Sequence, residues 1–448
     1  MKKLSLFLLL ACLGMQAQET KKSYSFSLQQ AIEHALQYNY SAINSGRDIE
    51  AAKKKKWETT ASGLPQINAG LDYANNFKLQ TQALTGNAFD PDGDPNKVTT
   101  LAFGTKHSMV ARTTLSQLIF DGSYIVALQA SKTYLQYYES SKKKTDLEVR
   151  EMIIKSYGNV LLAEENIAIL EKNKATLEKT LFDTEQTFKN GLIEEENVEQ
   201  LKITLSSINS SLNYTKRLKD ISYNMLKINL GIELEEELSL TDKLENLTTS
   251  NLDMALTGSS FEVKNSIDYA LSTNFVEQRT LEMKLEKSKF LPSLSANLNF
   301  GYNAFGNQFE FFTPDQKWFN YSNLGVGLNV PIFSSFGKNA KVQQTKIALE
   351  QAQTQLTETE QRLKLQYQNA KSDYEYSVEQ YFSSKENLSL AERIEKKQQV
   401  KFTEGISTSF EFTDAQRQLY SAQQTYLQSM VDVISKKAAL EKAIGKTN

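Results

Sequence analysis

The strongest constraint on the fold is that this chain repeats its own pattern. The segments FKNGLIEEENVEQ, starting at Phe188, and FTEGISTSFEFTDAQ, starting at Phe402, lie 214 residues apart, and each contains a glycine three residues after its phenylalanine. Gly231 and Gly445 are separated by the same 214 residues. Further upstream, Leu64-Pro65 matches Leu291-Pro292 and Ile119-Phe120 matches Ile332-Phe333. The chain is therefore a tandem duplication that builds one pattern of elements twice.

Long helices dominate each copy. After each of the two glycine turns, mostly apolar residues recur every seven positions: Val198, Leu205, Leu212, Lys219 and Leu226, then Phe412, Leu419, Tyr426, Val433 and Leu440. Sustained heptads indicate coiled-coil packing. Longer helices are predicted at 122–190 and 338–401, and roughly 65 helical residues make a rod of about 100 Å. The shorter helical segments, 28–63 and 192–230, have a similar summed length and are expected to stack end to end beside a long helix.

Four segments alternate with a period of two. They are predicted as strands at about 65–75, 106–117, 292–302 and 321–331; in the third, Leu294, Ala296 and Leu298 alternate with serine and asparagine. This period is typical of a strand with one apolar and one polar face. The length suits a tilted outer-membrane strand, and Trp318, Phe319 and Tyr321 lie where an aromatic girdle is expected. A soluble sheet with a solvated polar face is the alternative.

Four strands cannot close a barrel, and open sheet edges are not tolerated in lipid. If the strands span a membrane, several chains must share one barrel. Two chains give eight strands and a filled interior, whereas three give twelve and leave room for a water channel.

The N-terminus resembles an export signal. Lys2 and Lys3 precede an apolar run, and Ala17 ends a plausible cleavage site, so residues 1–17 are predicted to be a signal peptide. Cys12, the single cysteine, lies in this segment and is either lost on cleavage or a lipid-attachment site. The remaining predicted divisions are a first repeat at 18–231, an equatorial linker at 232–263 and a second repeat at 264–448.

The duplicated order of elements and the two glycine segments resemble the TolC family of outer-membrane channel proteins, over nearly the whole mature length. The resemblance implies an α+β membrane protein: a homotrimer with a twelve-stranded barrel in the outer membrane and an α-helical tunnel through the periplasm. It implies the outer-membrane channel of a tripartite efflux or type I secretion system. The implied partners are a periplasmic adaptor, an inner-membrane transporter of the RND, ABC or MFS type, and outer-membrane lipid.

Gly191 and Gly405 are expected to take the left-handed conformation that ends a helix and reverses the chain. Each would form the tip of a helical hairpin, with both tips together at the periplasmic mouth. Gly191, Leu192, Gly405 and Ile406 are therefore the candidate adaptor-docking residues. An ordinary helix–helix turn would use the same glycines.

A polar stripe follows Gly405: Glu411, Asp414, Gln418, Ser421, Thr425 and Gln428, at spacings of three and four. In a three-chain tunnel it would line the lumen, with Glu411 and Asp414 attracting cations and raising each other's pKa near the mouth. Thr408 and Glu411 also fit a helix capping box.

The gate of the TolC family resembles this acidic pair. However, the resemblance expects a tyrosine at Phe402, an arginine at Ser407 and an aspartate at Asn197, so closure is expected to depend on packing of Phe402 and Phe410.

Other chemistry is disfavoured. The formal charge of −2 argues against a nucleic-acid partner. Two histidines and one cysteine leave little for a metal site or a catalytic triad, and no phosphate-binding loop occurs, so no enzyme activity and no cofactor are expected. The Asp90–Pro95 segment lies in a long 75–106 connection that is expected to be a solvated loop. The alternative function is a periplasmic coiled-coil scaffold or adaptor with a soluble β-domain.

Overall fold

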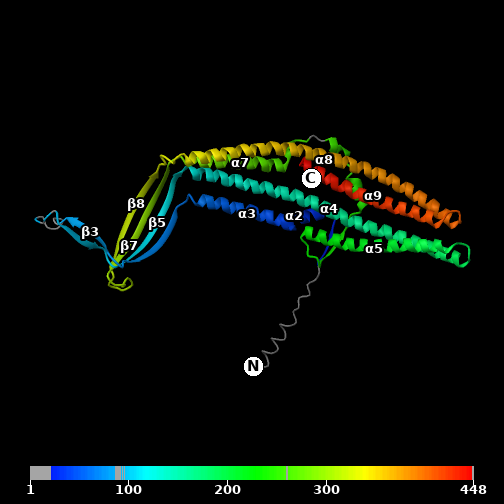
Figure 1. Cartoon of the computed structure of the whole chain (residues 1–448), viewed down its shortest axis with the longest axis horizontal. Helices are drawn as coiled ribbons and strands as arrows, with labels where there is room; N and C mark the ends of the chain where they lie inside the picture. The colour runs from blue at the N-terminus through cyan, green and yellow to red at the C-terminus, as the bar shows by residue number, and fades with distance from the viewer. Residues whose placement is uncertain (1–21, 86–91, 93, 95, 259–260, 446–448) are drawn as a thin grey trace, which may run out of the picture. The chain divides into compact units, whose positions relative to one another are not determined.

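The computed structural model describes residues 22–85, 92, 94, 96–258 and 261–445. The predicted signal peptide at 1–17 and Cys12 lie outside this range. Within it, the two copies have the same order of elements (Figure 1): a helical segment, two long strands, a long helix, a glycine turn and a 36-residue helix. The first copy consists of α2 (Leu28–Tyr38), α3 (Tyr40–Ala61), β2 (Gln66–Asn75), β5 (His107–Asp121), α4 (Gly122–Lys189) and α5 (Glu195–Leu230). The second consists of α7 (Ile267–Ser288), β7 (Ser293–Gly306), β8 (Trp318–Asn329), α8 (Gly337–Thr403) and α9 (Ser409–Ile444).

The chain forms two compact units, and the first is mostly helical. Its described part comes from residues 22–49, 137–273 and 355–445. The expected heptad residues contribute to its interior: Val198, Leu212, Leu226, Phe412, Leu419, Val433 and Leu440 are buried. Tyr157 of α4 and Tyr374 of α8 are fully buried in the same main core as Leu226, Val433 and Leu440. The duplicated helices therefore pack along the seams that the heptads predicted.

Glycines end both 36-residue helices where another helical segment meets them. Gly231 follows α5 at φ +74°, and a Cβ there would lie 2.1 Å from the Tyr38 carbonyl oxygen. The Asn39 side chain, between α2 and α3, donates a 2.8 Å hydrogen bond to the Asn229 carbonyl. Gly445 ends α9 at the same φ, and a Cβ there would lie 2.8 Å from the carbonyl oxygen of Asn265, which precedes α7. In both copies, the end of the glycine-capped helix thus meets the start of a 22-residue helix, α3 or α7. In the first copy this junction lies inside the predicted 28–63 segment, between α2 and α3, and not at its start.

The segment predicted as an equatorial linker, 232–263, contains its own small elements. These are β6 (Glu237–Leu240), α6 (Leu244–Ser250) and η1 (Met254–Gly258), followed by η2 (Val263–Asn265) at its edge. β6 pairs in parallel with β1 (Ser23–Phe26), a strand that the sequence analysis did not predict. Leu244 and Leu256 are buried in the main helical core, so this segment packs as part of the first unit.

The second unit, residues 50–136 and 274–354, contains a four-stranded antiparallel sheet in the order β2-β5-β7-β8. Figure 1 shows β5, β7 and β8 side by side. Because β5 pairs with β7, the sheet joins the two copies of the duplication. β7 and β8 reach Gly306 and Trp318, so both are longer at that end than the predicted 302 and 321.

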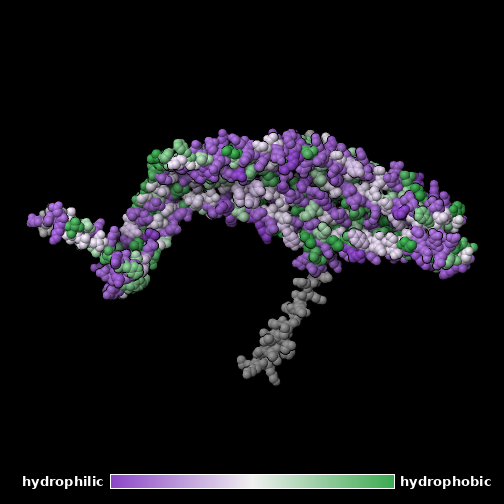
Figure 2. Space-filling model, viewed as in Figure 1, coloured by the Kyte–Doolittle hydropathy of each residue, from purple (hydrophilic) through white to green (hydrophobic). Residues whose placement is uncertain are grey.

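One face of this sheet is apolar. The register aligns Ile67, Leu115, Leu298 and Leu324 in one row across all four strands. In the single chain, Ile67 and Leu324 are 71% and 70% exposed. Figure 2 shows hydrophobic residues at the surface over the strands, beside hydrophilic ones. Within the described part of the second unit, this apolar face is therefore left uncovered.

The opposite face is polar and internally bonded. Thr114 donates a 2.8 Å hydrogen bond to Asn299, which donates one of 2.9 Å to Asn323. Arg112 forms an ion pair with Asp72 at 3.2 Å. This face thus satisfies its polar groups with one another across the strands.

Most of the Asp90–Pro95 segment, which was expected to be a solvated loop, lies outside the described residues. The described parts of the 75–106 connection contain a hairpin of β3 (Gln80–Thr85) and β4 (Val98–Phe103), which the sequence analysis did not predict. The expectation of an aromatic girdle is wrong. Trp318, Phe319 and Tyr321 do not form one girdle, because side chains alternate along β8 and Phe319 and Tyr321 point away from the face of Trp318. No helix in the described ranges is long and apolar enough to cross a membrane.

Candidate functional site: the helical hairpin tips

Both hairpins turn at a glycine with the predicted left-handed conformation. Gly191 has φ +71° and Gly405 has φ +69°. At the second tip, Gly405 N–H donates to the Phe402 carbonyl and Ile406 N–H to the Lys401 carbonyl, which is the Schellman arrangement. Gly191 and Leu192 bond the end of α4 in the same way. Leu192 and Ile406, the residues directly after the two glycines, are 73% and 76% exposed.

The two tips lie together in the helical unit. The Asn197 side-chain oxygen, near the start of α5, accepts a 3.3 Å hydrogen bond from the backbone N–H of Ser409, the first residue of α9. Phe402 stacks on Phe412 with ring centroids 5.3 Å apart. Phe412 of the second hairpin is fully buried in a small core with three residues of the first hairpin, Leu177, Leu201 and Ile208. Asn197, noted in the sequence only as a departure from the family pattern, is thus a contact between the tips.

Glu411 is part of a helix cap. Thr408 is the N-cap of α9, and its hydroxyl accepts from the Glu411 backbone N–H at 3.2 Å. In return, the Glu411 carboxylate accepts from the Thr408 backbone N–H at 3.0 Å. The capping box considered from the sequence is therefore confirmed. The hydrogen bond from the Thr408 backbone holds the pKa of Glu411 below its ordinary value within the single chain.

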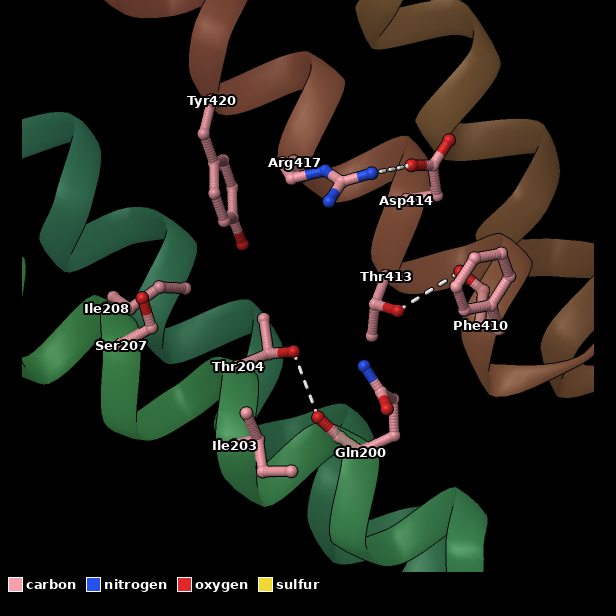
Figure 3. A pocket seen from close by; sticks show the side chains of 10 residues that line it. All are labelled: Gln200, Ile203, Thr204, Ser207, Ile208, Phe410, Thr413, Asp414, Arg417 and Tyr420. Atoms are coloured by element: carbon pink, nitrogen blue, oxygen red, sulfur yellow. Dashed lines mark hydrogen bonds and ion pairs between the residues drawn. The ribbon is translucent and has the colours of Figure 1, made fainter.

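Asp414 has a basic partner that the sequence analysis missed. The Arg417 guanidinium forms an ion pair with the Asp414 carboxylate (Figure 3). The Gln418 side chain donates a second hydrogen bond to this carboxylate at 2.7 Å. The i,i+3 spacing on a predicted helix was the available signal. Arg417 thus partly neutralises the charge of the Asp414 carboxylate within each chain.

Phe402 and Phe410, the two residues expected to close the gate by packing, have different surroundings within the single chain. Phe402 packs inward on Phe412, but Phe410 is 68% exposed. Figure 3 shows Phe410 at the edge of a cavity of 260 Å³ between α5 and α9. Its wall includes Gln200, Thr204, Thr413, Asp414, Arg417 and Tyr420. Burial raises the pKa of Tyr420, with the Glu395 carboxylate adding to the effect, so this wall keeps a neutral phenol.

A larger cavity, of 800 Å³, lies between the two tips. Four threonines of α4 line it, together with Phe402 and Gly405 from the second hairpin: Thr176, Thr180, Thr184 and Thr187. The tips therefore form one surface with a polar hollow rather than two separate turns.

Comparison with known proteins agrees with this arrangement. Residues 275–446 match a family model described as "Outer membrane efflux protein". The match covers most of the second copy of the duplication. This family match in the second copy, together with the fold of solved outer-membrane channels, confirms the resemblance to TolC-type channels that was drawn from the duplicated pattern.

Solved outer-membrane channel structures have the same fold as this chain. CusC aligns with TM-score 0.74 and 15% identity, over 96% of this chain and 95% of that one. The CmeC outer membrane channel of Campylobacter jejuni aligns with TM-score 0.73 and 18% identity, over 97% and 92%. VceC of Vibrio cholerae aligns with TM-score 0.68 and 16% identity, over 93% and 96%. No curated protein sequence matches the chain significantly.

Proposed function

We propose that this protein is one protomer of a trimeric exit channel for efflux. It lies in the outer membrane and extends into the periplasm, where a helical tunnel receives substrate. Three copies of the four-stranded sheet form a twelve-stranded barrel, whose size leaves a water-filled interior. The channel is passive and not an enzyme.

The observation that supports this proposal most strongly is the uncovered apolar face of the sheet. Leu298, Leu324 and Val326 are 46%, 70% and 64% exposed in the single chain. Edge strands β2 and β8 also have unpaired backbone groups, which water or another strand must satisfy. Because the order β2-β5-β7-β8 is antiparallel throughout, β8 of one copy runs antiparallel to β2 of the next, as a continuous barrel requires. In the proposed barrel, lipid covers the apolar face, and the strands of neighbouring copies pair with the edges β2 and β8.

A periplasmic scaffold with a soluble β-domain fits less well. Such a domain would bury the apolar side of its sheet under its own helices. Here the row from Ile67 to Leu324 is left open.

Membrane fractionation followed by sizing in mild detergent tests the channel. We expect the protein in the outer-membrane extract, as a trimer that conducts ions in planar bilayers. A folded monomer in the soluble periplasmic fraction would favour the scaffold.

The hairpin tips are proposed as the periplasmic gate and the adaptor-docking surface. The exposed Leu192 and Ile406 suit an apolar contact with a periplasmic adaptor, which links the channel to an inner-membrane transporter of the RND, ABC or MFS type. Glu411 and Asp414 are proposed to face the lumen near the mouth, with Phe402 holding the second tip against its core.

Bilayer conductance tests the gate charges. Glu411→Gln with Asp414→Asn should lower cation selectivity, because carboxylates at a narrow mouth attract cations. Arg417→Gln should raise it, because it frees the Asp414 carboxylate from its ion pair. If selectivity is the same in all three channels, these residues lie away from the narrow part of the path.

A further inference from the structure

The loop between β7 and β8, residues 307–317, lies at one end of the apolar sheet face. The register aligns Tyr73, Met109, Ala304 and Trp318 in the last row before this loop. Tyr73 is six residues from Ile67 along β2, and side chains on a strand alternate between faces. This row therefore points to the same side as the apolar row of Ile67 and Leu324. Because β7 follows α7 and β8 precedes α8, the loop is at the strand ends opposite these helices.

The loop folds back onto that face. Phe311 is 2% exposed and packs on Met109, Ala304 and Trp318. Two turns hold its backbone: Thr313 N–H donates to the Glu310 carbonyl at 3.1 Å, and Gln316 N–H to the Thr313 carbonyl at 3.2 Å. The loop is thus attached to the apolar side of the sheet by a buried aromatic ring.

The folded loop leaves two other aromatic rings outside. Phe309 is 55% exposed and Phe312 is 77% exposed, with ring centroids 6.2 Å apart. Phe309 also meets Tyr73 edge-on at 5.3 Å. These rings continue the apolar surface of the strands past their ends. Contiguous exposed apolar surface indicates an interaction site, and aromatic residues at barrel ends favour the boundary between acyl chains and headgroups.

We propose that the 307–317 loop is a membrane anchor that inserts Phe309 and Phe312 among lipid acyl chains at the outer boundary of the membrane. This inference rests on the proposed function, because it needs the apolar sheet face to contact lipid. The anchor replaces the girdle expected from Trp318, Phe319 and Tyr321. Because Phe311 holds the loop against the sheet, insertion of Phe309 and Phe312 also fixes the depth of the strands in the membrane.

Site-directed spin labelling of the full chain in phosphatidylcholine vesicles tests the anchor. Nitroxides are attached at Phe312→Cys in the loop, at Leu324→Cys on the apolar face and at Asn323→Cys on the polar face. The parent chain, whose only cysteine is Cys12, is the labelling blank. All three sites are exposed in the single chain, so the substitutions should not disturb folding.

The measurement is the ratio of nitroxide collisions with oxygen, which concentrates in lipid, to collisions with a water-soluble nickel chelate. We expect a high ratio at positions 312 and 324 and a low ratio at 323. A high ratio at 324 with a low one at 312 overturns the anchor and leaves the channel intact. A low ratio at 324 overturns the proposed function and the anchor with it.

A second variant tests the role of the buried ring. Adding Phe311→Ser to the Phe312→Cys chain should release the loop, so the label becomes more mobile and its collision ratio falls toward that of position 323. A ratio that stays high would show that docking on Met109 and Trp318 does not position the anchor, and would overturn that part of the proposal.

Discussion

The two hairpin tips have the same backbone turn but differ in the residues that begin the next helix. Gly191 and Gly405 have φ values within two degrees of each other, and both are followed by an exposed aliphatic residue. After the first, Glu194 is an N-cap without a side-chain hydrogen bond. After the second, Thr408 forms a complete capping box with Glu411. Duplication thus preserved the turn, for which left-handed glycine is needed, while the helix starts diverged. Tip geometry and tip stability are therefore set by different residues and can be changed separately.

Gly231 and Gly445, at the C-terminal ends of α5 and α9, can be compared in the same way. Substitution of these glycines is expected to destabilise the protein most. Gly231→Ala would place a Cβ 2.1 Å from the Tyr38 carbonyl oxygen, at a positive φ. The backbone must then shift, and we expect a loss of about 3 kcal/mol or more from the strain and the overlap together. Gly445→Ala, with its contact at 2.8 Å, should cost less.

Thermal unfolding of the detergent-solubilised protein measures this difference. Gly46→Ala is the matched control, because Gly46 lies inside α3 with nothing within 4 Å of a built Cβ. That change should stabilise the protein by about 0.5–1 kcal/mol, because alanine is the better helix former. Equal melting temperatures for the Gly231 and Gly445 variants would contradict the ranking of the two junctions.

At the tips, the glycine substitutions should have a smaller and nearly equal effect. Neither Gly191 nor Gly405 has an atom within 4 Å of a built Cβ, so only the left-handed backbone opposes alanine. This costs about 1–2 kcal/mol at each tip. Hydrogen exchange of amides in the last turns of α4 and α8 measures the local loss. A much larger loss at one tip would mean that the two turns are not equivalent.

Substitutions in the helix caps should affect the two tips differently. Thr408→Ala removes the side-chain acceptor for the Glu411 amide and should destabilise the start of α9 by about 1 kcal/mol. Glu194→Ala has no such bond to lose at the start of α5. Exchange rates of the first-turn amides of the two helices are the readout. If both substitutions accelerate exchange equally, the capping box does not explain the difference between the tips.

The Asn197 contact is expected to be weaker still. Asn197→Ala removes the 3.3 Å bond to the Ser409 amide, and a bond of this kind contributes about 1 kcal/mol or less. Faster exchange of the Ser409 amide, with no change at Gly191, would support its role as a link between the hairpins. Unchanged exchange would mean that packing around Phe412 alone holds the tips together.

Much of the fold could be predicted because its determinants are local and periodic. The heptad from Val198 and the alternation from Leu294 each depend on one repeating interval. The left-handed turns at Gly191 and Gly405 follow from a single residue type. What could not be predicted depends on long-range contacts. The pairing of β1 with β6 joins segments more than 200 residues apart, and the folding of Phe311 onto Met109 depends on the register of three strands.

The candidate site was harder to predict for the same reason. The capping box of Thr408 and Glu411 is a local motif and was visible in the sequence. The hydrogen bond between Asn197 and Ser409 joins the two copies and was not visible in the sequence. Arg417 was a local omission, since its spacing from Asp414 is that of a helical ion pair.

Acidification should weaken one tip and not the other, and this is the smallest expected effect. The folded-state pKa of Glu411 lies below its ordinary value of 4.5, so folding favours the carboxylate. Its contribution is therefore fully present above pH 4.5 and is lost as the pH falls through the lower, folded-state pKa. Hydrogen exchange at the start of α9, corrected for the intrinsic pH dependence, should show the cap opening in this acidic window. The start of α5, whose N-cap Glu194 makes no side-chain cap bond, should not change in the same way. Glu411→Gln is the decisive control, because an amide oxygen still accepts from Thr408 but does not titrate. If the pH response persists in that variant, another group at the second tip is responsible, and the contrast between the two caps is not electrostatic.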